Sequence, residues 1–385
     1  MVVAGTRPEV IKLAPVVEAC KAEKDLRTLF CLTGQHRELA DDVVAFFGLN
    51  VDYRLDVMRK DQDLSGVTSR VLSALQPVLQ ARKPDIVVVQ GDTVTCFAAS
   101  LAAFFQKIPV CHVEAGLRTY DLSAPFPEEA LRQMVTRITS LHCAATAANR
   151  DNLLAEGISE TNVVVTGNTV IDALYRARDL LSAGGEQFLK LSPAELARIE
   201  TYGRFVLITG HRRENFGDKL ASICQALATC AAQHPDVLFV YPIHPNPNVL
   251  TPVRKILGSL DNVMLLGPLN YPDFIYLMNR CHLVVTDSGG IQEEAPALGK
   301  PVIVTRHETE RQEAVATGQV VLAGTSMSSI GHALEDLLCS PDRYAQMSRA
   351  ESPYGDGKAA GRISSSIMTF IRDSRSALTC HIKPC

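Results

Sequence analysis

The sequence predicts an α/β protein built from doubly wound, parallel sheets. Short apolar segments of strand length alternate with helical segments along the whole chain, which is typical of parallel sheets. The alternation begins again after a break near residues 182–185. A chain of 385 residues also exceeds the length at which single hydrophobic cores stop growing, so two domains are expected.

The first half of the chain contains a series of apolar segments that each end in a polar turn. The predicted strands are residues 1–4, 29–32, 85–90, 108–113, 141–144 and 162–165. The predicted helices are residues 39–47, 61–82 and 93–105, and one that opens with Glu128 and Glu129. The strand at Met1 is short for a central strand, which predicts that the natural chain starts a few residues earlier.

The second half repeats the pattern. The predicted strands are residues 205–209, 237–243, 263–266, 283–286, 301–305 and 320–322, and the predicted helices include residues 170–181, 194–200 and 219–233. We expect an N-terminal domain at 1–168, a C-terminal domain at 169–355, a helix at 356–372 that crosses back to the first domain, and a frayed tail at 373–385.

Composition excludes several classes of protein. A formal net charge of −4 argues against a general nucleic-acid binder, and no apolar run approaches the roughly 18 residues that span a membrane. The N-terminus lacks the features of a signal peptide, so a cytoplasmic protein without membrane association is expected. The 11 cysteines are scattered without a C-x-x-C pair, which indicates free buried thiols. No metal site is expected, including at Cys380, His381 and Cys385.

Three carboxylates follow the strands in the first half. Asp92 and Glu114 come just after two consecutive buried strands, and Glu128 lies in the first turn of a later helix. Each one alone is most simply a helix cap. Because ligands bind beyond the carboxyl ends of parallel strands, the three together, with Arg118 and Arg132 nearby, predict acid/base chemistry on an anionic substrate.

Two glycine turns are candidates for binding an anion. Gly5-Thr-Arg-Pro precedes a helix, where Arg7 and Lys12 add positive charge, although Lys12 also fits a solvated helix face. Asp287-Ser-Gly-Gly lies between a strand and a helix, and Glu294 one turn later could bind ribose hydroxyls. His211 follows a strand in this half and favours a phosphate contact. The absence of G-x-G-x-x-G from the sequence argues against a nicotinamide cofactor.

Eight motifs occur in one order between Gly5 and about Arg362, and together they resemble the bacterial UDP-N-acetylglucosamine 2-epimerase family of the non-hydrolysing type. The motifs are Gly5-Thr-Arg-Pro-Glu9, Gln90-Gly-Asp-Thr93, His112-Val-Glu-Ala-Gly-Leu-Arg118, Pro127-Glu-Glu-Ala130, Gly167-Asn-Thr169, Gly210-His-Arg-Arg-Glu214, Thr286-Asp-Ser-Gly-Gly-Ile-Gln-Glu-Glu294 and Thr309-Glu-Arg311.

The resemblance implies a fold like that of B-type glycosyltransferases, with two Rossmann-like domains facing across a cleft and a C-terminal helix crossing back to the first. It implies interconversion of UDP-N-acetylglucosamine and UDP-N-acetylmannosamine without NAD, through loss of UDP to give 2-acetamidoglucal and its re-addition. A homodimer that supplies N-acetylmannosamine units for surface polysaccharide is expected on the same basis.

The resemblance also assigns roles to residues. Asp92, Glu114, Glu128 and His211 match catalytic positions. Positions that bind substrate or UDP are matched by Arg7, Lys12, Arg132, Leu269, Phe274 (against uracil), Ser288, Gly289, Gly290, Glu294 (on ribose) and Arg311. A second, activating UDP-N-acetylglucosamine site corresponds to Gln35, His36, Arg37, Arg70 and His244, with a generic polar surface between the domains as an equally weighted alternative.

Three other functions remain open from the sequence. A hydrolysing relative would release free N-acetylmannosamine and UDP, a glycosyltransferase of the same fold would pass the sugar to an acceptor, and a nucleotide-sugar sensor would catalyse nothing. The intact set of acid/base residues favours epimerisation over the last two.

Overall fold

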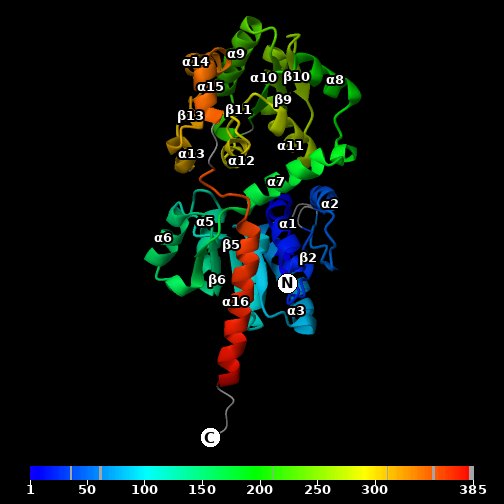
Figure 1. Cartoon of the computed structure of the whole chain (residues 1–385), viewed down its shortest axis with the longest axis vertical. Coiled ribbons are helices and arrows are strands. Elements are labelled where there is room, and N and C mark those ends of the chain that lie inside the picture. Colours follow the sequence, from blue (N-terminus) through cyan, green and yellow to red (C-terminus); the bar gives the residue numbers. More distant parts are fainter. Residues whose placement is uncertain (35–36, 60–62, 211, 310, 349–351, 381–385) are drawn as a thin grey trace. The chain divides into compact units, whose positions relative to one another are not determined.

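The computed structural model describes residues 1–34, 37–59, 63–210, 212–309, 311–348 and 352–380. The chain forms two compact units, each with its own parallel sheet (Figure 1). The first unit comprises Met1–Arg176 and Tyr354–Cys385, and the second comprises Ala177–Pro353. The division falls inside a helix, α7 (Thr169–Ser182), whereas the sequence placed the boundary just before that helix at 168/169.

The sheet of the first unit has seven strands in the order β3-β2-β1-β4-β5-β6-β7, and every pairing is parallel. Its strands are β1 (Val2–Ala4), β2 (Phe30–Leu32), β3 (Tyr53–Arg54), β4 (Val87–Gln90), β5 (Val110–Ala115), β6 (Leu141–Ala144) and β7 (Val163–Val165). The order reverses between β1 and β4. In Rossmann-type sheets such a reversal opens a crevice at the carboxyl ends of the two strands, where ligands bind.

The helices of the first unit start at polar caps. They are α1 (Arg7–Ala22), α2 (Arg37–Phe46), α3 (Leu64–Arg82), α4 (Val94–Phe105), α5 (Glu128–Ile138), α6 (Ala147–Ala155), α7 and α16 (Ala359–Cys380). The side chains of Thr6, Asp63, Thr93 and Thr146 each accept a hydrogen bond from the first turn of the helix that follows. These caps explain why α1, α3, α4 and α6 begin immediately after strand-end turns or loops.

The C-terminal helix is longer than predicted. The sequence ended it at residue 372 and expected a frayed tail from 373, but α16 continues to Cys380. Its start is held by Asp172, whose carboxylate accepts the N–H groups of Ala359 and Ala360 at 3.2 and 2.8 Å. Further along, Arg375 pairs with Asp85 at 2.9 Å, so the extension has partners on the first unit. In Figure 1 this helix is red, and it packs against α1 and β6.

The second unit repeats the same strand order, β10-β9-β8-β11-β12-β13, again with parallel pairings. Its strands are β8 (Phe205–Thr209), β9 (Leu238–Pro242), β10 (Val263–Leu266), β11 (Leu283–Thr286), β12 (Val302–Val304) and β13 (Val320–Leu322). Its helices are α8 (Pro193–Tyr202), α9 (Asp218–Gln233), α10 (Pro247–Leu257), α11 (Tyr271–Arg280), α12 (Ile291–Ala297), α13 (Gln312–Ala316), α14 (Met327–Cys339) and α15 (Pro341–Ser348). The reversal here lies between β8 and β11.

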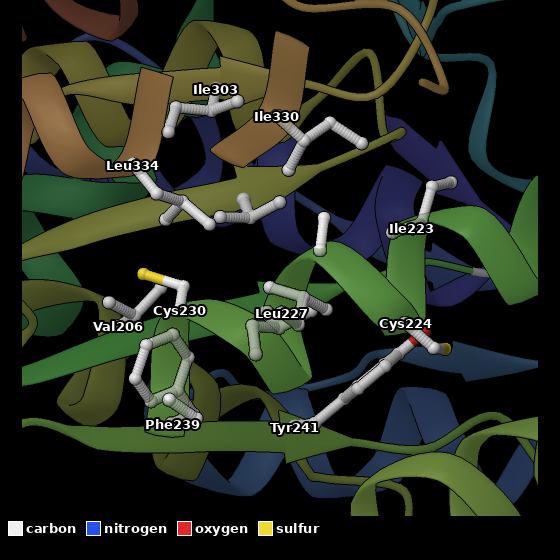
Figure 2. Close-up of a cluster of buried hydrophobic side chains, with 14 of the residues drawn as sticks. Val206, Ile223, Cys224, Leu227, Cys230, Phe239, Tyr241, Ile303, Ile330 and Leu334 are labelled. Atoms are coloured by element: carbon white, nitrogen blue, oxygen red, sulfur yellow. The ribbon is translucent and has the colours of Figure 1, made fainter. Parts of the chain in front are cut away.

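The core of the second unit joins one face of its sheet to α9, α10 and α14 (Figure 2). Phe239 and Tyr241 from β9 lie beside Leu227 from α9, and Ile330 and Leu334 from α14 belong to the same cluster. All five side chains are 2% exposed or less, so burial of apolar surface fixes the positions of the two helices. Within the described ranges, no helix has the length and apolarity needed to cross a bilayer.

Candidate active site

Glu114 is held in an unusual backbone conformation at the end of β5. The pairing of β5 with β6 shifts register between Val113 and Ala115, and Glu114 occupies the bulge with φ 64°. A non-glycine residue in this region costs about 1–3 kcal/mol, and such strain is found mostly at functional sites. Gly116 follows with φ 86°, and a Cβ there would lie 2.1 Å from the carbonyl oxygen of Asn149. The Glu-Ala-Gly motif therefore redirects the chain at this strand end.

The Glu114 carboxylate receives hydrogen bonds from three separate elements. Lys12 Nζ on α1 lies 2.8 and 2.7 Å from its two oxygens, and the amide of Gln90 at the end of β4 also donates to it. Asn168 Nδ2, just before α7, lies 3.3 Å from Oε1. These donors stabilise the ionised carboxylate. The alternative interpretation of Lys12 as part of a solvated helix face is therefore wrong.

A second carboxylate, Asp92, lies at the neighbouring strand end and is paired with Arg132 of α5. The guanidinium of Arg132 also bonds Glu129 Oε2 through NH1 at 2.8 Å, and the arginine is only 6% exposed. Asp92 thus follows β4 as predicted, whereas Glu114, expected just after its strand, lies in the bulge near the end of the adjacent parallel strand β5; each is paired with its own cation.

Glu129, which the sequence did not single out, organises the loop before α5. It is fully buried and accepts the N–H groups of Thr119 and Tyr120 at 3.0 and 3.1 Å, as well as the Gln133 amide at 2.8 Å. Burial alone would raise the pKa of this carboxyl, but the hydrogen bonds and the charge of Arg132 outweigh it and hold the pKa below its usual value. The neighbouring Glu128 is half-buried and forms no hydrogen bond or ion pair with the residues the structure describes.

Arg118 does not join the carboxylates with which it was expected to lie. Its buried guanidinium pairs with Glu156 at 2.6 Å and donates to Thr136 Oγ1 at 2.8 Å. It therefore ties α5 and α6 together. Sequence proximity to Glu114 was misleading because the turn after Gly116 carries the chain away from the strand end.

The predicted anion cradle at the start of α1 is occupied by the protein itself. The N–H groups of Gly5 and Thr6 donate to Glu9 at 3.0 and 2.7 Å, and Thr93 Oγ1 donates to the same carboxylate at 2.7 Å. Burial raises the pKa of Glu9, although these hydrogen bonds oppose the shift. Through the bond from Thr93, which caps α4, Glu9 connects the turn after β1 to the start of α4. Arg7 is the first residue of α1 and is half-buried.

Two buried histidines lie on β5 and β6, and one of them contacts the turn that carries Asp92. His112 and His142 are register partners on β5 and β6, and each is 1% exposed. His112 Nε2 lies 2.7 Å from the carbonyl oxygen of Gly91, which directly precedes Asp92. Burial lowers the pKa of His112 to about 4 and that of His142 to about 3, the latter with help from the nearby His112 and Arg118. A neutral His112 with its proton on Nε2 therefore fixes the Gly91 turn.

These histidines predict a loss of stability in mild acid. Folding lowers both pKa values below the unfolded value of about 6.5, so their contribution is complete above pH 6.5 and declines as pH falls toward 4. At pH 5 the loss is about 2 kcal/mol per histidine. Urea unfolding followed by circular dichroism at pH 7.5 and 5 is expected to show a smaller difference in His112→Gln than in the wild-type protein. The exposed His332 provides the matched control, His332→Gln. Equal pH dependence in all three proteins would contradict the prediction.

In the second unit, Asp287 links the two strands at the reversal of the sheet. Its buried Oδ2 accepts the N–H of Arg212 at 2.9 Å and the Asn215 amide at 3.3 Å, so the turn after β8 is held against the end of β11. Thr286 Oγ1 accepts the N–H of Ser288 at 2.9 Å. The turn that continues through Gly289 and Gly290 is therefore anchored at its base.

The motif after Asp287 meets the Thr309–Arg311 motif. Gln292 donates to the Ser288 carbonyl at 3.1 Å and accepts from Thr309 at 2.6 Å, while Arg311 Nε lies 2.7 Å from the buried Glu293. The outer part of the turn is open. Gly290 is exposed, and an added Cβ there would meet no described atom within 4 Å.

The other residues predicted to bind substrate or to form the second site are spread over both units. Three half-buried ones belong to the second unit: Leu269 after β10, Phe274 on α11 and Glu294 on α12. Two residues predicted for the second, activating site lie in different units. Arg70 is in the first unit, where its Nε donates to the Val57 carbonyl at 2.9 Å. His244 is in the second unit, where it is exposed and accepts the Asn246 N–H at 3.2 Å. Arg37 is the first residue of α2. Gln35, His36 and His211 lie outside the described residues.

Two parallel sheets, each with polar residues at the strand ends where its order reverses, define an α/β enzyme with the fold class of B-type glycosyltransferases. A family model described as UDP-N-acetylglucosamine 2-epimerase matches residues 18–368. The UDP-N-acetylglucosamine 2-epimerases of Yersinia pestis and Escherichia coli K12 are 50% and 48% identical to this chain over 363 residues, which cover 94% of this chain and 96% of each relative. The chain belongs to the UDP-N-acetylglucosamine 2-epimerase family.

A solved relative agrees in fold. The crystal structure of the Neisseria meningitidis UDP-GlcNAc 2-epimerase bound to UDP-GlcNAc is similar to this chain with a TM-score of 0.83 at 43% identity, covering 96% of this chain and 99% of that one.

Proposed function

We propose that this protein interconverts UDP-N-acetylglucosamine and UDP-N-acetylmannosamine by inverting C2 of the sugar. The observation that carries the proposal is the pair of carboxylates at the adjacent ends of β4 and β5, Asp92 with Arg132 and Glu114 with Lys12. Family membership adds the substrate class, because the Neisseria relative was solved with UDP-GlcNAc bound.

The chemistry of C2 explains why the site needs several charged groups. The C2 proton is weakly acidic, since the acetamido group does not directly stabilise a carbanion there. In the proposed route a base removes this proton while the C1–O bond breaks and UDP leaves with the bonding electrons, giving 2-acetamidoglucal. Cations near the diphosphate favour this departure. A proton then reaches the opposite face of C2 as UDP adds back to C1, so groups on both faces are required.

The first unit is proposed to supply the proton-transfer groups, with Asp92, Glu114 and Glu128 as acids and bases. Arg132 and Lys12 pair with the first two and are proposed to balance their charges, and Arg7 is assigned to the diphosphate. His211 is assigned to the same step on the strength of the family pattern.

The second unit is proposed to hold the nucleotide. The open turn Ser288–Gly290 lies at the sheet reversal, where its backbone can approach phosphate closely. Glu294 is assigned to ribose, Phe274 and Leu269 to the uracil side, and Arg311 to the substrate. The reaction neither oxidises nor reduces the substrate overall, and the proposal includes no NAD.

The proposal is tested by incubating the purified protein with UDP-N-acetylglucosamine in deuterated water, without NAD, and resolving products by NMR. We expect UDP-N-acetylmannosamine to appear and deuterium to enter C2 of both UDP-sugars. Free N-acetylmannosamine with UDP as the main products would indicate hydrolysis. Absence of C2 exchange, with sugar passed to an added acceptor, would indicate a glycosyltransferase, and no turnover at all would indicate a binding protein.

The proposed setting is the cytoplasm, with the protein acting as a homodimer that supplies N-acetylmannosamine units for surface polysaccharide. Equilibrium sedimentation tests the dimer directly. A single species with the mass of one 41.8 kDa chain across the micromolar range would contradict it.

A further inference from the structure

A second cluster of ligand-type side chains lies in the second unit and uses none of the motifs discussed above. His234 caps the carboxyl end of α9, while Glu335 and Cys339 lie one turn apart on α14. His234 Nε2 lies 2.8 Å from Glu335 Oε2, and Cys339 Sγ lies 3.2 Å from Glu335 Oε1. The three possible ligand atoms, one from each residue, all lie within 4.8 Å of one another.

The backbone at this cluster is positioned by the core rather than by the cluster itself. Leu227 of α9 and Leu334 of α14 belong to the same buried group (Figure 2). The end of α9 is also fixed by Asn262, whose amide bonds the carbonyls of Ala231 and His234 at 2.9 and 3.0 Å. Residues four apart on a helix share a face, so Glu335 and Cys339 both face the His234 side. The site is thus presented by two rigid elements.

We propose that His234, Glu335 and Cys339 bind a divalent cation of the zinc type, with water as the fourth ligand. Imidazole, carboxylate and thiolate are the donors that Zn²⁺ prefers, and three protein ligands plus water is a common set. Bonds of about 2.0–2.3 Å in a tetrahedron separate the donor atoms by roughly 3.3–3.7 Å. His234 Nε2 and Cys339 Sγ contact different oxygens of Glu335, at 2.8 and 3.2 Å, and the three candidate ligand atoms, one from each residue, lie within 4.8 Å of one another, so rotation of these side chains would bring one Glu335 oxygen, the imidazole nitrogen and the sulfur to this spacing.

The binding step balances simply. Before binding, the Glu335 carboxylate accepts hydrogen bonds from His234 and from the Cys339 thiol. On binding, the thiol releases its proton to solvent and the neutral imidazole moves its proton from Nε2 to Nδ1. Sulfur, nitrogen and oxygen each donate a lone pair to the cation, and no redox change occurs. The bound cation would join the ends of α9 and α14.

Cobalt provides an optical test, because a Co²⁺–thiolate bond absorbs in the near ultraviolet and four-coordinate Co²⁺ absorbs in the visible. The parent is the full-length chain with Cys380→Ser and Cys385→Ser, which removes the two tail thiols; the other eight described cysteines are buried. After chelator treatment and dialysis, we expect one equivalent of Co²⁺ to give both bands and Zn²⁺ to abolish them. We also expect Zn²⁺ to raise the thermal midpoint by a few degrees, as binding to the folded state requires.

Single substitutions in this parent test whether the three residues bind the cation. Cys339→Ser is expected to remove the thiolate band and the thermal shift, and His234→Gln to weaken Co²⁺ binding at least about tenfold. Glu313→Gln, a change at a carboxylate outside the cluster, is expected to leave both unchanged. Circular dichroism confirms folding of each variant. Absence of a thiolate band in the parent, or an equal band in Cys339→Ser, would overturn the proposal, as would a midpoint shift that persists in both cluster variants.

Discussion

Replacing Glu114 by Gln is expected to lower turnover by on the order of 100-fold or more while leaving UDP affinity nearly unchanged. Loss of a general acid or base has this scale. The amide keeps the shape of the carboxylate, so the bulge at the end of β5 survives. It cannot accept a proton from C2, however, and it leaves Lys12 without the carboxylate that it contacts at 2.7 and 2.8 Å. Steady-state kinetics with UDP-N-acetylglucosamine, together with UDP titration calorimetry, measure the two effects separately.

Asp92→Asn is expected to behave in the same way, since Arg132 keeps its second partner, Glu129. Asp121→Asn is the matched control, because Asp121 is exposed and caps only a local turn through the Ser123 N–H. The C2 hydrogen exchange rate adds a discriminating measurement. If both Glu114→Gln and Asp92→Asn retained near-wild-type turnover and exchange, neither residue could be an acid or base in the reaction.

Much of the fold is predictable because it depends on local apolar patterns. The structure gives β6, β10, β11 and β13 the predicted bounds, since each is a short apolar run between polar turns. The two-residue β3 carries too little apolar sequence to be recognised, and it exists because it pairs with the edge of β2. The length of α16 was missed for a related reason. Its last turns are polar, and they are held by ion pairs to residues hundreds of positions away.

The candidate site was predictable in part. That Asp92 and Glu114 lie at the same edge of the sheet was predictable, because carboxylates at the ends of consecutive parallel strands must meet there; their catalytic roles stay a prediction. Contacts that depend on the path of a loop could not be predicted from the order of strands and polar residues in the sequence. The occupation of the Gly5–Thr6 amides by Glu9 is one such case, and the bond from His112 to the Gly91 carbonyl is another. A period-two pattern on β5 does place His112 on the opposite face from Cys111, but nothing local indicates its partner.

Choosing between Glu128 and Glu129 was beyond sequence reasoning, because adjacent carboxylates in a first helical turn look equivalent. The structure separates them clearly. Glu129 is fully buried, pairs with Arg132 and receives the N–H groups of Thr119 and Tyr120, whereas Glu128 is half-buried without a described partner. Glu129 is therefore expected to stabilise the fold, and Glu128 is expected to be available for proton transfer.

This difference gives the last prediction, a crossed pair of variants. Glu129→Ala is expected to lower the free energy of unfolding by about 3–5 kcal/mol, because it leaves the buried Arg132 guanidinium with one carboxylate and strands two backbone N–H groups. Glu128→Ala is expected to change that free energy by about 0.5 kcal/mol or less, yet to lower turnover by on the order of 100-fold.

Urea unfolding and the epimerase assay are run on both variants. We expect Glu129→Ala to lose more free energy of unfolding than Glu128→Ala, and Glu128→Ala to lose turnover without a matching loss of stability. Glu129→Gln serves as the graded control, since its amide oxygen can still accept the Thr119 and Tyr120 N–H groups and only the charge is lost. Its destabilisation should fall between those of the two alanine variants. If Glu128→Ala were instead the less stable protein, or if it turned over substrate as fast as the wild-type protein, the separation of a structural Glu129 from a catalytic Glu128 would be wrong. The acid/base set would then reduce to Asp92 and Glu114, and the second face of C2 would have to be served by one of them.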